Sequence, residues 1–420
     1  MPPILHCPHA RECGACQHVN ESYADQLARK DERMAQLFAE FEGVEVRSIL
    51  GMEHPYYYRN KVISPYAPGR RIAADGDGRT HRKSGRRAAS DRGRGAGSRR
   101  RVDGPRYEIL CGMYAAGTHR IVATDECLVE NELAKRVVLT IRQLMPKFGI
   151  QPYNEDTGTG FLRHAVVRVG HTSGEVLVTL VTNGREFPAS RAFCRELVKR
   201  CPFITTVVQN VNERQTNVIL GEREQRLYGP GFILDRLCGL SFRISSQSFY
   251  QVNAVQTEVL YNTAIELARF GGTERVVDAY CGTGTIGLVA ASRGASEVIG
   301  IDSVESAIAD ARQNARHNGI ENARFIAADA GDMMRRLAAD GERIDVVLMD
   351  PPRAGSSEAF LDALAQLAPK RVAYISCNPQ TQVRDCLHLR KRGYTLAAVQ
   401  PVDMFPHTDH VETVALLTRE

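Results

Sequence analysis

Short apolar runs recur at regular intervals between about Ser241 and the C-terminus, separated by segments long enough for a helix. The runs are Val276–Asp278, Glu297–Asp302, Ala323–Ala327, Ile344–Met349 and Val372–Ser376. Regular alternation of strand and helix is typical of parallel sheets, because each helix carries the chain back to the starting edge. The sequence therefore predicts an α/β fold with a doubly wound, Rossmann-like sheet over 241–420.

A glycine turn follows the first of these runs. Gly282, Gly284 and Gly287 match the spacing Gly-x-Gly-x-x-Gly, directly after Asp278 and Tyr280. Such a turn between a strand and a helix lets the backbone approach a nucleoside cofactor closely. Taken alone, the motif indicates only a tight turn, and a dehydrogenase remains an alternative.

Acidic residues at the ends of the later runs help to distinguish between the possible nucleoside cofactors. Asp302 lies about 20 residues beyond the turn, where a carboxylate accepts from ribose hydroxyls. Asp329 follows the third run, near the expected adenine edge, and Asp350 begins Asp-Pro-Pro after the fourth. Together these positions favour S-adenosylmethionine as cofactor. Arg353 stands where amino-group methyltransferases carry an aromatic residue, which argues against that chemistry.

A thiol and a carboxylate complete a possible reaction. Cys377 ends the last apolar run, and Glu412 follows 35 residues later. A thiolate that adds to C6 of a pyrimidine makes C5 nucleophilic, and a base must then remove the C5 proton. Taken alone, Cys377 could be a structural cysteine and Glu412 a solvated carboxylate. His410 is an alternative base.

These motifs resemble those of the RNA uridine-5-methyltransferases, in particular the bacterial 23S ribosomal RNA enzymes with an iron–sulfur cluster. The resemblance rests on Cys7-x5-Cys13-x2-Cys16, Ser248–Asn253, Asp278–Leu288, Asp350–Arg353, Ser376–Pro379 and His410–Glu412. It implies that Cys377 is the nucleophile, Glu412 the C5 base, and Gln251 and Tyr280 cofactor contacts. It also places Asp350 between the cofactor and uracil. Relatives often carry an RNA-binding β-barrel before the first cluster cysteine, which we expect to be absent here because only six residues precede Cys7.

The N-terminal cysteines are bunched more closely than packing requires. Cys7, Cys13 and Cys16 suit an iron–sulfur cluster, and the resemblance implies Cys127 as the fourth ligand of a [4Fe–4S] cluster. A four-cysteine zinc site is the alternative, and spacing alone favours neither. Methyl transfer needs no electron, so we expect a structural role.

Positive charge is concentrated in one segment. Between Arg70 and Arg106 there are twelve arginines and one lysine against four aspartates, a net charge of +9, whereas the whole chain carries +5. The low-complexity segment 68–105 is predicted to be a disordered insertion between two paired strands. Its arginines could bind RNA phosphates, or it could be only a linker.

The patterns predict four regions. They are a cysteine segment (1–25), a helical segment docking on the catalytic domain (26–58, with helical periodicity over 26–42), a mixed α/β RNA-binding domain (59–240) and the methyltransferase domain (241–420). No apolar run approaches the roughly 18 residues of a membrane span, and no signal peptide is evident, so we expect a cytoplasmic monomer without membrane or obligate protein partner.

The predicted function is methylation of uracil C5 in RNA, with 23S ribosomal RNA as the leading substrate. One alternative is the same reaction on transfer RNA. Another is a non-catalytic RNA-binding or assembly factor, against which the joint presence of Cys377, Glu412, Gln251 and Asp350 argues. DNA cytosine methyltransferases also use a thiol, usually in Pro-Cys, whereas here Pro379 follows Cys377.

Overall fold

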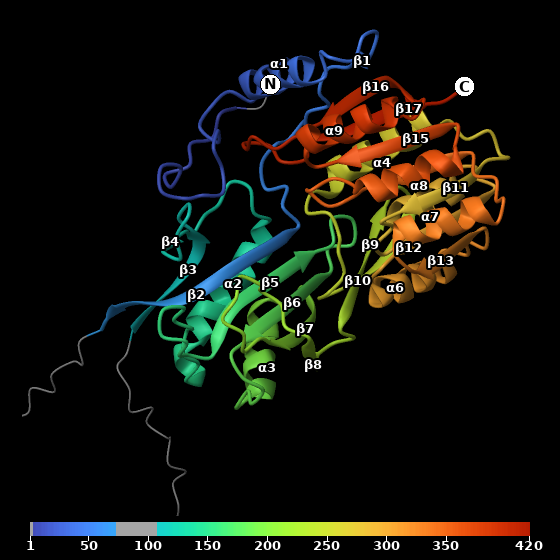
Figure 1. Cartoon of the computed structure of the whole chain (residues 1–420). Coiled ribbons are helices and arrows are strands. Elements are labelled where there is room, and N and C mark those ends of the chain that lie inside the picture. The colour runs from blue at the N-terminus through green and yellow to red at the C-terminus, as the bar shows by residue number, and fades with distance from the viewer. Residues whose placement is uncertain (1–2, 73–106) are drawn as a thin grey trace, which may run out of the picture.

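The computed structural model describes residues 3–72 and 107–420, arranged as two lobes that each contain a sheet (Figure 1). Residues 73–106, between the two described ranges, hold most of the predicted insertion and lie outside the described residues. The C-terminal lobe carries the predicted catalytic motifs, and the central lobe carries the strands that flank the insertion.

The C-terminal lobe is built on an eight-stranded sheet with the order β1-β16-β17-β15-β14-β11-β12-β13. Five strands are parallel: β11 (Arg275–Ala279), β12 (Glu297–Asp302), β13 (Ala323–Ala327), β14 (Val346–Met349) and β15 (Arg371–Ser376). They agree with the predicted runs to within two residues. The last strand, β17 (Glu412–Thr418), is antiparallel to both β15 and β16 (Thr395–Val402), and β1 (Glu45–Val46) extends the edge beside β16.

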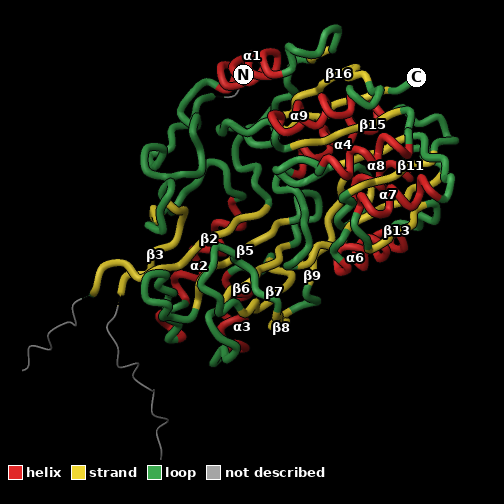
Figure 2. The backbone as a smooth tube through the Cα atoms, viewed as in Figure 1, coloured by secondary structure: helices red, strands yellow, loops and turns green. Residues whose placement is uncertain are grey.

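Helices cover both faces of this sheet (Figure 2). One apolar cluster includes residues of α4 (Ala254–Ala268), α5 (Thr285–Ser292) and α6 (Glu305–His317). A second cluster on the opposite face includes residues of α7 (Ala330–Ala339), α8 (Glu358–Leu367) and α9 (Pro379–Arg390). Strands β11, β14 and β15 between them are buried over nearly their whole length, which explains why their sequences are largely apolar, whereas the edge strand β13 is partly exposed.

The N-terminal helix packs on the second of these faces. Helix α1 spans Tyr23–Leu37, and Met34, Phe38 and Phe41 join the apolar cluster of α7–α9. The helix begins three residues before the predicted start and ends earlier, because Phe38 already leaves the helical conformation. The rest of the predicted helical segment consists of turns and the short strand β1.

The central lobe contains a seven-stranded sheet with the order β4-β3-β2-β5-β6-β7-β8. Its strands are β2 (Lys61–Arg71), β3 (Tyr107–Tyr114), β4 (Ile121–Ala123), β5 (Leu162–Val169), β6 (Val176–Thr182), β7 (Ile204–Val211) and β8 (Arg223–Tyr228). Helices α2 (Glu132–Leu144) and α3 (Ser190–Arg200) pack on it, and a 3-10 turn spans Pro146–Phe148.

The two strands that flank the insertion are paired as predicted, but the boundary differs. Strand β2 continues to Arg71, which lies opposite Tyr107 of β3. The predicted start of the disordered segment at Pro68 is therefore wrong, because Pro68–Arg71 still belong to the hairpin.

A small hairpin lies where the two lobes meet in the sequence. Strands β9 (Phe232–Leu237) and β10 (Leu240–Ser245) pair only with each other, and β10 spans the predicted domain boundary at 240. Among the helices of the described residues, none is both long and apolar enough to cross a membrane.

Candidate active site

Cys377 lies in the bend between β15 and α9, at the carboxyl end of a central parallel strand. Asn378 caps the helix, since its Oδ1 accepts a hydrogen bond from the amide of Gln380 at 3.2 Å. The Nδ2 of Asn378 donates to the carbonyl of Arg353 at 3.2 Å, and Thr381 Oγ1 donates to the same carbonyl at 3.3 Å. The Asn-Pro that follows the thiol thus ties its bend to the Asp-Pro-Pro-Arg loop.

The register of strand pairing brings Glu412 to the same place. Thr413 of β17 lies opposite Ser376 of β15 in the antiparallel ladder, and each has a site residue as its neighbour. Thr413 Oγ1 also donates to Gln382 of α9 at 2.6 Å. Glu412 is the first residue of β17 and is only 4% exposed. The carboxylate and Cys377, 35 residues apart in sequence, therefore lie at adjoining strand ends.

Both carboxyl groups of the site are held in an environment that favours the protonated form. Burial raises the pKa of Glu412 to about 8, with a further contribution from the charge of Asp350. Burial likewise raises the pKa of Asp350 to about 7. Two carboxyls that titrate near neutrality in one cleft are typical of acid–base chemistry.

Arg353 lowers the pKa of nearby site groups and so opposes the effect of burial. It was not among the predicted site residues. Burial raises the pKa of the Cys377 thiol, and the charges of Glu412 and Asp350 raise it further, whereas a hydrogen bond and the charge of Arg353 lower it. Arg353 also lowers the pKa of Glu412. A guanidinium here stabilises the thiolate, which is the reactive form of a cysteine. The signal in the sequence was its position directly after Asp-Pro-Pro.

His410, the alternative base, is exposed and lies two residues before Glu412. Its ring is nevertheless partly shielded from water, and this desolvation, followed by the charges of Arg353 and Lys30, lowers its pKa. Its ring meets that of Phe405 edge-on, at 5.9 Å between centroids.

The glycine turn after β11 is packed too closely against the protein for side chains at two of its positions. Gly284 has φ +78°, and a Cβ there would lie 2.8 Å from the ring of Phe325. A Cβ on Gly287 would lie 2.6 Å from Asp278 Oδ2, which accepts the amide of Gly287 at 2.9 Å. Tyr280 adopts φ +63°, a conformation that costs a non-glycine residue about 1–3 kcal/mol. The chain is thus held in an unfavourable conformation at the strand end.

Asp278 provides an independent sign of a missing ligand. Its Oδ1 atom is buried without a hydrogen-bond partner among the described residues, and burial raises its pKa well above the ordinary value. Buried polar atoms are almost always paired. A donor group on a bound nucleoside cofactor, or a water beside it, would satisfy this oxygen, so the turn fits the expected cofactor.

The other predicted cofactor contacts lie along the same edge of the sheet. Asp302 ends β12 and accepts from the amides of Gly282 and Val304, both at 2.9 Å. Asp329 is exposed and caps α7 through the amide of Asp332 at 2.9 Å. A carboxylate has about four acceptor positions, so both can also accept from a ligand.

Gln251 lies apart from these strand ends, in the loop before α4, and is half-buried. Asn253, two residues later, caps α4 and donates to the carbonyl of Met404 at 3.0 Å. This contact anchors the Gln251 loop to the segment that leads into Glu412.

The four predicted ligand cysteines line one small cavity between the N-terminal segment and the loop after β4. Burial, opposed by the charge of Arg59 and assisted by the charges of Cys127, Cys13 and Cys7, raises the pKa of Cys16 to about 12, so the four thiols influence one another. No group of three or more His, Cys, Asp or Glu side chains that could hold a metal ion occurs in residues 3–72 and 107–420. The expected iron–sulfur cluster therefore stays a prediction.

Comparisons with known proteins agree with this geometry. Residues 272–404 match a family model described as a methyltransferase domain. The chain is 38% identical to an uncharacterized RNA methyltransferase of Halalkalibacterium halodurans over 98% of this chain and 82% of the relative. Another, from Staphylococcus aureus strain MSSA476, is also 38% identical, over 98% of this chain and 83% of the relative.

A solved structure is similar over both lobes. The tRNA (uracil-54, C5)-methyltransferase of Pyrococcus abyssi, in complex with S-adenosyl-L-homocysteine, has a TM-score of 0.73 and 27% identity, covering 99% of this chain and 88% of that chain. The C-terminal lobe is therefore an S-adenosylmethionine-dependent methyltransferase fold. With relatives of this identity over nearly its full length, the chain belongs to the RNA methyltransferase family.

Proposed function

We propose that this enzyme methylates C5 of uracil in RNA, with Cys377 as nucleophile and Glu412 as base. The observation that carries the proposal is the pairing of Ser376 with Thr413, which sets the thiol beside a buried carboxylate. Both lie at the carboxyl edge of the sheet, where α/β folds bind their ligands.

The first step is addition of the Cys377 thiolate to C6 of the ring. The new S–C6 bond moves the C5–C6 electron pair into an enolate, with carbanion character at C5. Arg353 favours the thiolate by lowering the pKa of the thiol. S-adenosylmethionine supplies the methyl group that C5 then takes.

The second step is removal of the proton from C5 by Glu412. The electron pair of the C5–H bond re-forms the C5–C6 double bond, and Cys377 leaves as thiolate. A base is most effective when its pKa lies near the working pH, and the pKa of about 8 caused by burial meets this condition. His410 is the alternative base, but its exposed position makes Glu412 the better candidate.

Residues along the same sheet edge would hold the cofactor. Asp302 would accept from the ribose, Asp329 would face the adenine, and Tyr280 would lie beside the nucleoside. Gln251 would donate a hydrogen bond from the loop before α4, and Asp350 would lie between cofactor and uracil. A stacked base cannot reach Cys377, so the target must be flipped out or lie in an RNA loop.

We also propose that Cys7, Cys13, Cys16 and Cys127 hold a [4Fe–4S] cluster. Four thiols around one cavity are the donor set of such a cluster. The cluster would fasten the N-terminal segment to the central lobe.

The RNA substrate has two candidates. The resemblance of the motifs, including the cysteine cluster, favours 23S ribosomal RNA. The similarity of the fold to a transfer RNA enzyme favours transfer RNA. We propose ribosomal RNA as the substrate and keep transfer RNA as the second candidate.

Mapping of 5-methyluridine by mass spectrometry tests the proposed reaction and distinguishes between the two candidate RNA substrates. RNA from a strain that lacks the protein should lose the modification at one or more ribosomal positions. The purified enzyme with S-adenosylmethionine should restore it on the unmodified RNA. Loss confined to transfer RNA would select the second candidate, and an unchanged content in all RNA would contradict the proposed function.

A further inference from the structure

Two adjoining cavities lie in the central lobe, away from the residues of the catalytic site. Their volumes are about 490 and 760 Å³, and both are lined by Tyr114, His119 and Glu155. Pockets for small ligands have volumes of about 300–1,000 Å³. The cavities are therefore large enough for a nucleotide.

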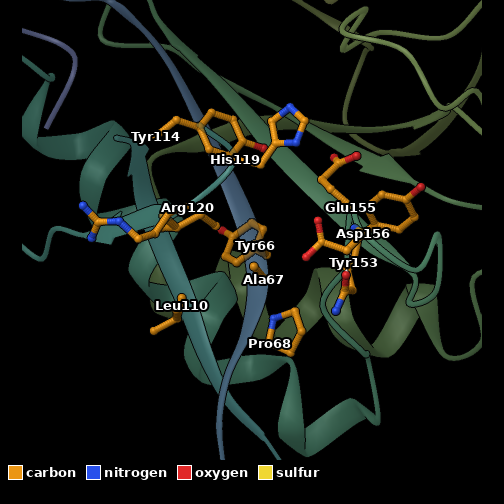
Figure 3. Close-up of a pocket in the computed structure, with 12 residues that line it drawn as sticks. Tyr66, Ala67, Pro68, Leu110, Tyr114, His119, Arg120, Tyr153, Glu155 and Asp156 are labelled. Carbon is orange, nitrogen blue, oxygen red and sulfur yellow. Dashed lines mark hydrogen bonds between the residues drawn. The ribbon is translucent and has the colours of Figure 1, made fainter. Parts of the chain in front are cut away.

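Aromatic rings form one side of this space. The ring of Tyr114 meets those of His119 and His164 edge-on, with centroids 6.1 and 6.5 Å apart. The Tyr114 hydroxyl lies 3.3 Å from His164 Nε2, which holds the ring in place. Figure 3 shows the side chains of Tyr114 and His119 next to each other on one side of the first cavity, with Tyr66 below them in this view. Faces of this kind stack unpaired bases.

Carboxylates form the opposite side. Glu155 and Asp156 lie across the cavity from Tyr114 (Figure 3). The turn that carries them is fixed by Asn154, whose Oδ1 accepts from the amides of Asp156 and Thr157 at 2.9 and 3.1 Å. The exposed Asp156 carboxylate forms no ion pair with any described residue. This side of the cavity thus offers acceptors to a ligand that carries N–H donors.

Two buried side chains of the second cavity have unused polar atoms. Arg163 and His164 are 2% and 4% exposed, and Arg163 Nε and His164 Nδ1 have no hydrogen-bond partner among the described residues. The Nη1 of Arg163 donates to the carbonyls of Asn212 and Arg214 at 2.9 and 2.7 Å. Its Nη2 lies 3.4 Å from Glu155, and the guanidinium lies over the ring of Tyr153 at 4.4 Å. A buried polar atom without a partner costs about 1–3 kcal/mol, so such a pair indicates a site that is completed by a ligand.

The two strands that flank the arginine-rich segment contribute residues to the lining of the first cavity. Pro68 of β2 and Leu110 of β3 line that cavity, and the two strands pair as far as Arg71 and Tyr107. The residues that follow in the sequence, 73–106, are rich in arginine. The first cavity is thus lined by the strands that flank the most basic part of the sequence.

We propose that the two adjoining cavities together bind an unpaired guanine nucleotide of the RNA substrate, with its base beside Tyr114 and His119, which line both cavities, and its Watson–Crick edge on Asp156 of the first. Guanine presents adjacent N1–H and N2–H donors, which match the two oxygens of a carboxylate. Uracil presents one N–H between two carbonyl oxygens, which a carboxylate repels, and adenine presents one donor beside an acceptor. That the ligand is RNA rests on the proposed function. The site adds to that function a second point of RNA recognition, distant from the methylated base.

Binding of nucleotides to the full-length protein tests the site without any turnover. Saturation-transfer NMR would compare 5′-GMP, 5′-AMP and 5′-UMP on the wild type and on Asp156→Asn and His119→Ala. Glu186→Gln, which changes an exposed acid elsewhere in the central lobe, is the matched control. We expect GMP to bind about tenfold more tightly than UMP, as one charged hydrogen bond implies. Asp156→Asn should abolish this preference, His119→Ala should weaken all binding, and Glu186→Gln should change neither.

Equal binding of GMP and UMP, or GMP binding that survives both cavity variants, would overturn the proposal. Deletion of Ala73–Val102 separates the cavity from the arginine-rich segment, and GMP affinity should not change. If the deletion strengthened GMP binding, that segment would be the natural occupant and the proposal would be wrong. Because these measurements need neither cofactor nor methylation, a failure of the proposed function would leave their result intact.

Discussion

The Nζ atom of Lys30 lies 2.6 Å from Oδ1 of Asp403, and the two side chains are only 6% and 0% exposed. The hydroxyl of Tyr23 donates to the other oxygen of Asp403 at 2.7 Å. His407, four residues further, accepts through its carbonyl the amides of Gln17 and His18. Helix α1 and the cysteine segment therefore hold the loop that leads from β16 to Glu412.

Replacing one partner of this buried pair should destabilise the protein strongly. Lys30→Met leaves Asp403 charged and buried, which typically costs about 3–5 kcal/mol. Arg29→Met is the matched control on the same helix, since the exposed pair of Arg29 with Glu21 contributes at most about 1 kcal/mol. The urea concentrations at which the N-terminal and catalytic regions of each full-length variant unfold measure the two effects. Similar midpoints for the two variants would show that the pair does not anchor the loop.

Cys377→Ala should abolish methyl transfer but leave binding of S-adenosylhomocysteine nearly unchanged, because the thiol acts on the base. Calorimetry and incorporation of labelled methyl groups measure the two properties. Cys238→Ala, which removes a thiol from the β9–β10 turn, should retain activity. Methylation by Cys377→Ala would contradict the role of the thiol.

Glu412→Gln should still form the covalent adduct and methylate C5, but should stall before release. A denaturing gel should show an RNA-linked protein band that the wild type lacks. RNA labelled with tritium at C5 should no longer lose its label to water. If the band does not accumulate and tritium is still released, another group removes the proton, with His410 as the first candidate.

The pH dependence of the wild type follows from the same carboxyl. Its pKa of about 8 means that the basic form increases as pH rises, and the raised pKa of Cys377 acts in the same direction. We expect kcat/KM to rise about tenfold between pH 7 and pH 9 in the wild type. Rates that fall over this interval would contradict the assignment of a carboxyl base in its deprotonated form.

Protein purified without oxygen should be brown and contain about four iron atoms per chain. Replacing Cys7, Cys13, Cys16 or Cys127 by serine should lower the iron content, whereas Cys194→Ser, in α3, should not. Iron analysis and the visible absorption spectrum measure this. Colourless protein that contains zinc would show that the same cysteines serve a different metal.

Deleting Ala73–Val102 should weaken RNA binding and flatten its salt dependence, because ten basic residues leave with only three acidic ones. Each lost phosphate contact reduces the slope of log affinity against log salt by roughly 0.7–0.9. Filter binding over a range of salt concentrations measures the slope, and the methylated position should stay the same. An unchanged slope would identify the segment as a linker.

The parallel sheet could be predicted from the sequence because its signal is local. A strand buried on both faces must be apolar throughout, and a glycine turn must follow where the backbone meets a ligand, as at Gly284. Strand β12, which is buried over Val298–Ile301, was predicted to the residue for this reason. The start of the insertion was not, because Pro68–Arg71 lack apolar side chains and are strand only through pairing with β3.

The amino-acid sequence by itself determined the kinds of chemical group in the site: a thiol, carboxylates and a glycine turn at the ends of strands. Only the tertiary structure decided which of them meet. Glu412 lies beside Cys377 because β17 runs antiparallel to β15 in one particular register, and a shift of one residue would turn its side chain to the other face. The role of Arg353 beside the thiol, and the cavity of the central lobe, likewise depend on contacts between segments far apart in the chain, which no local pattern records.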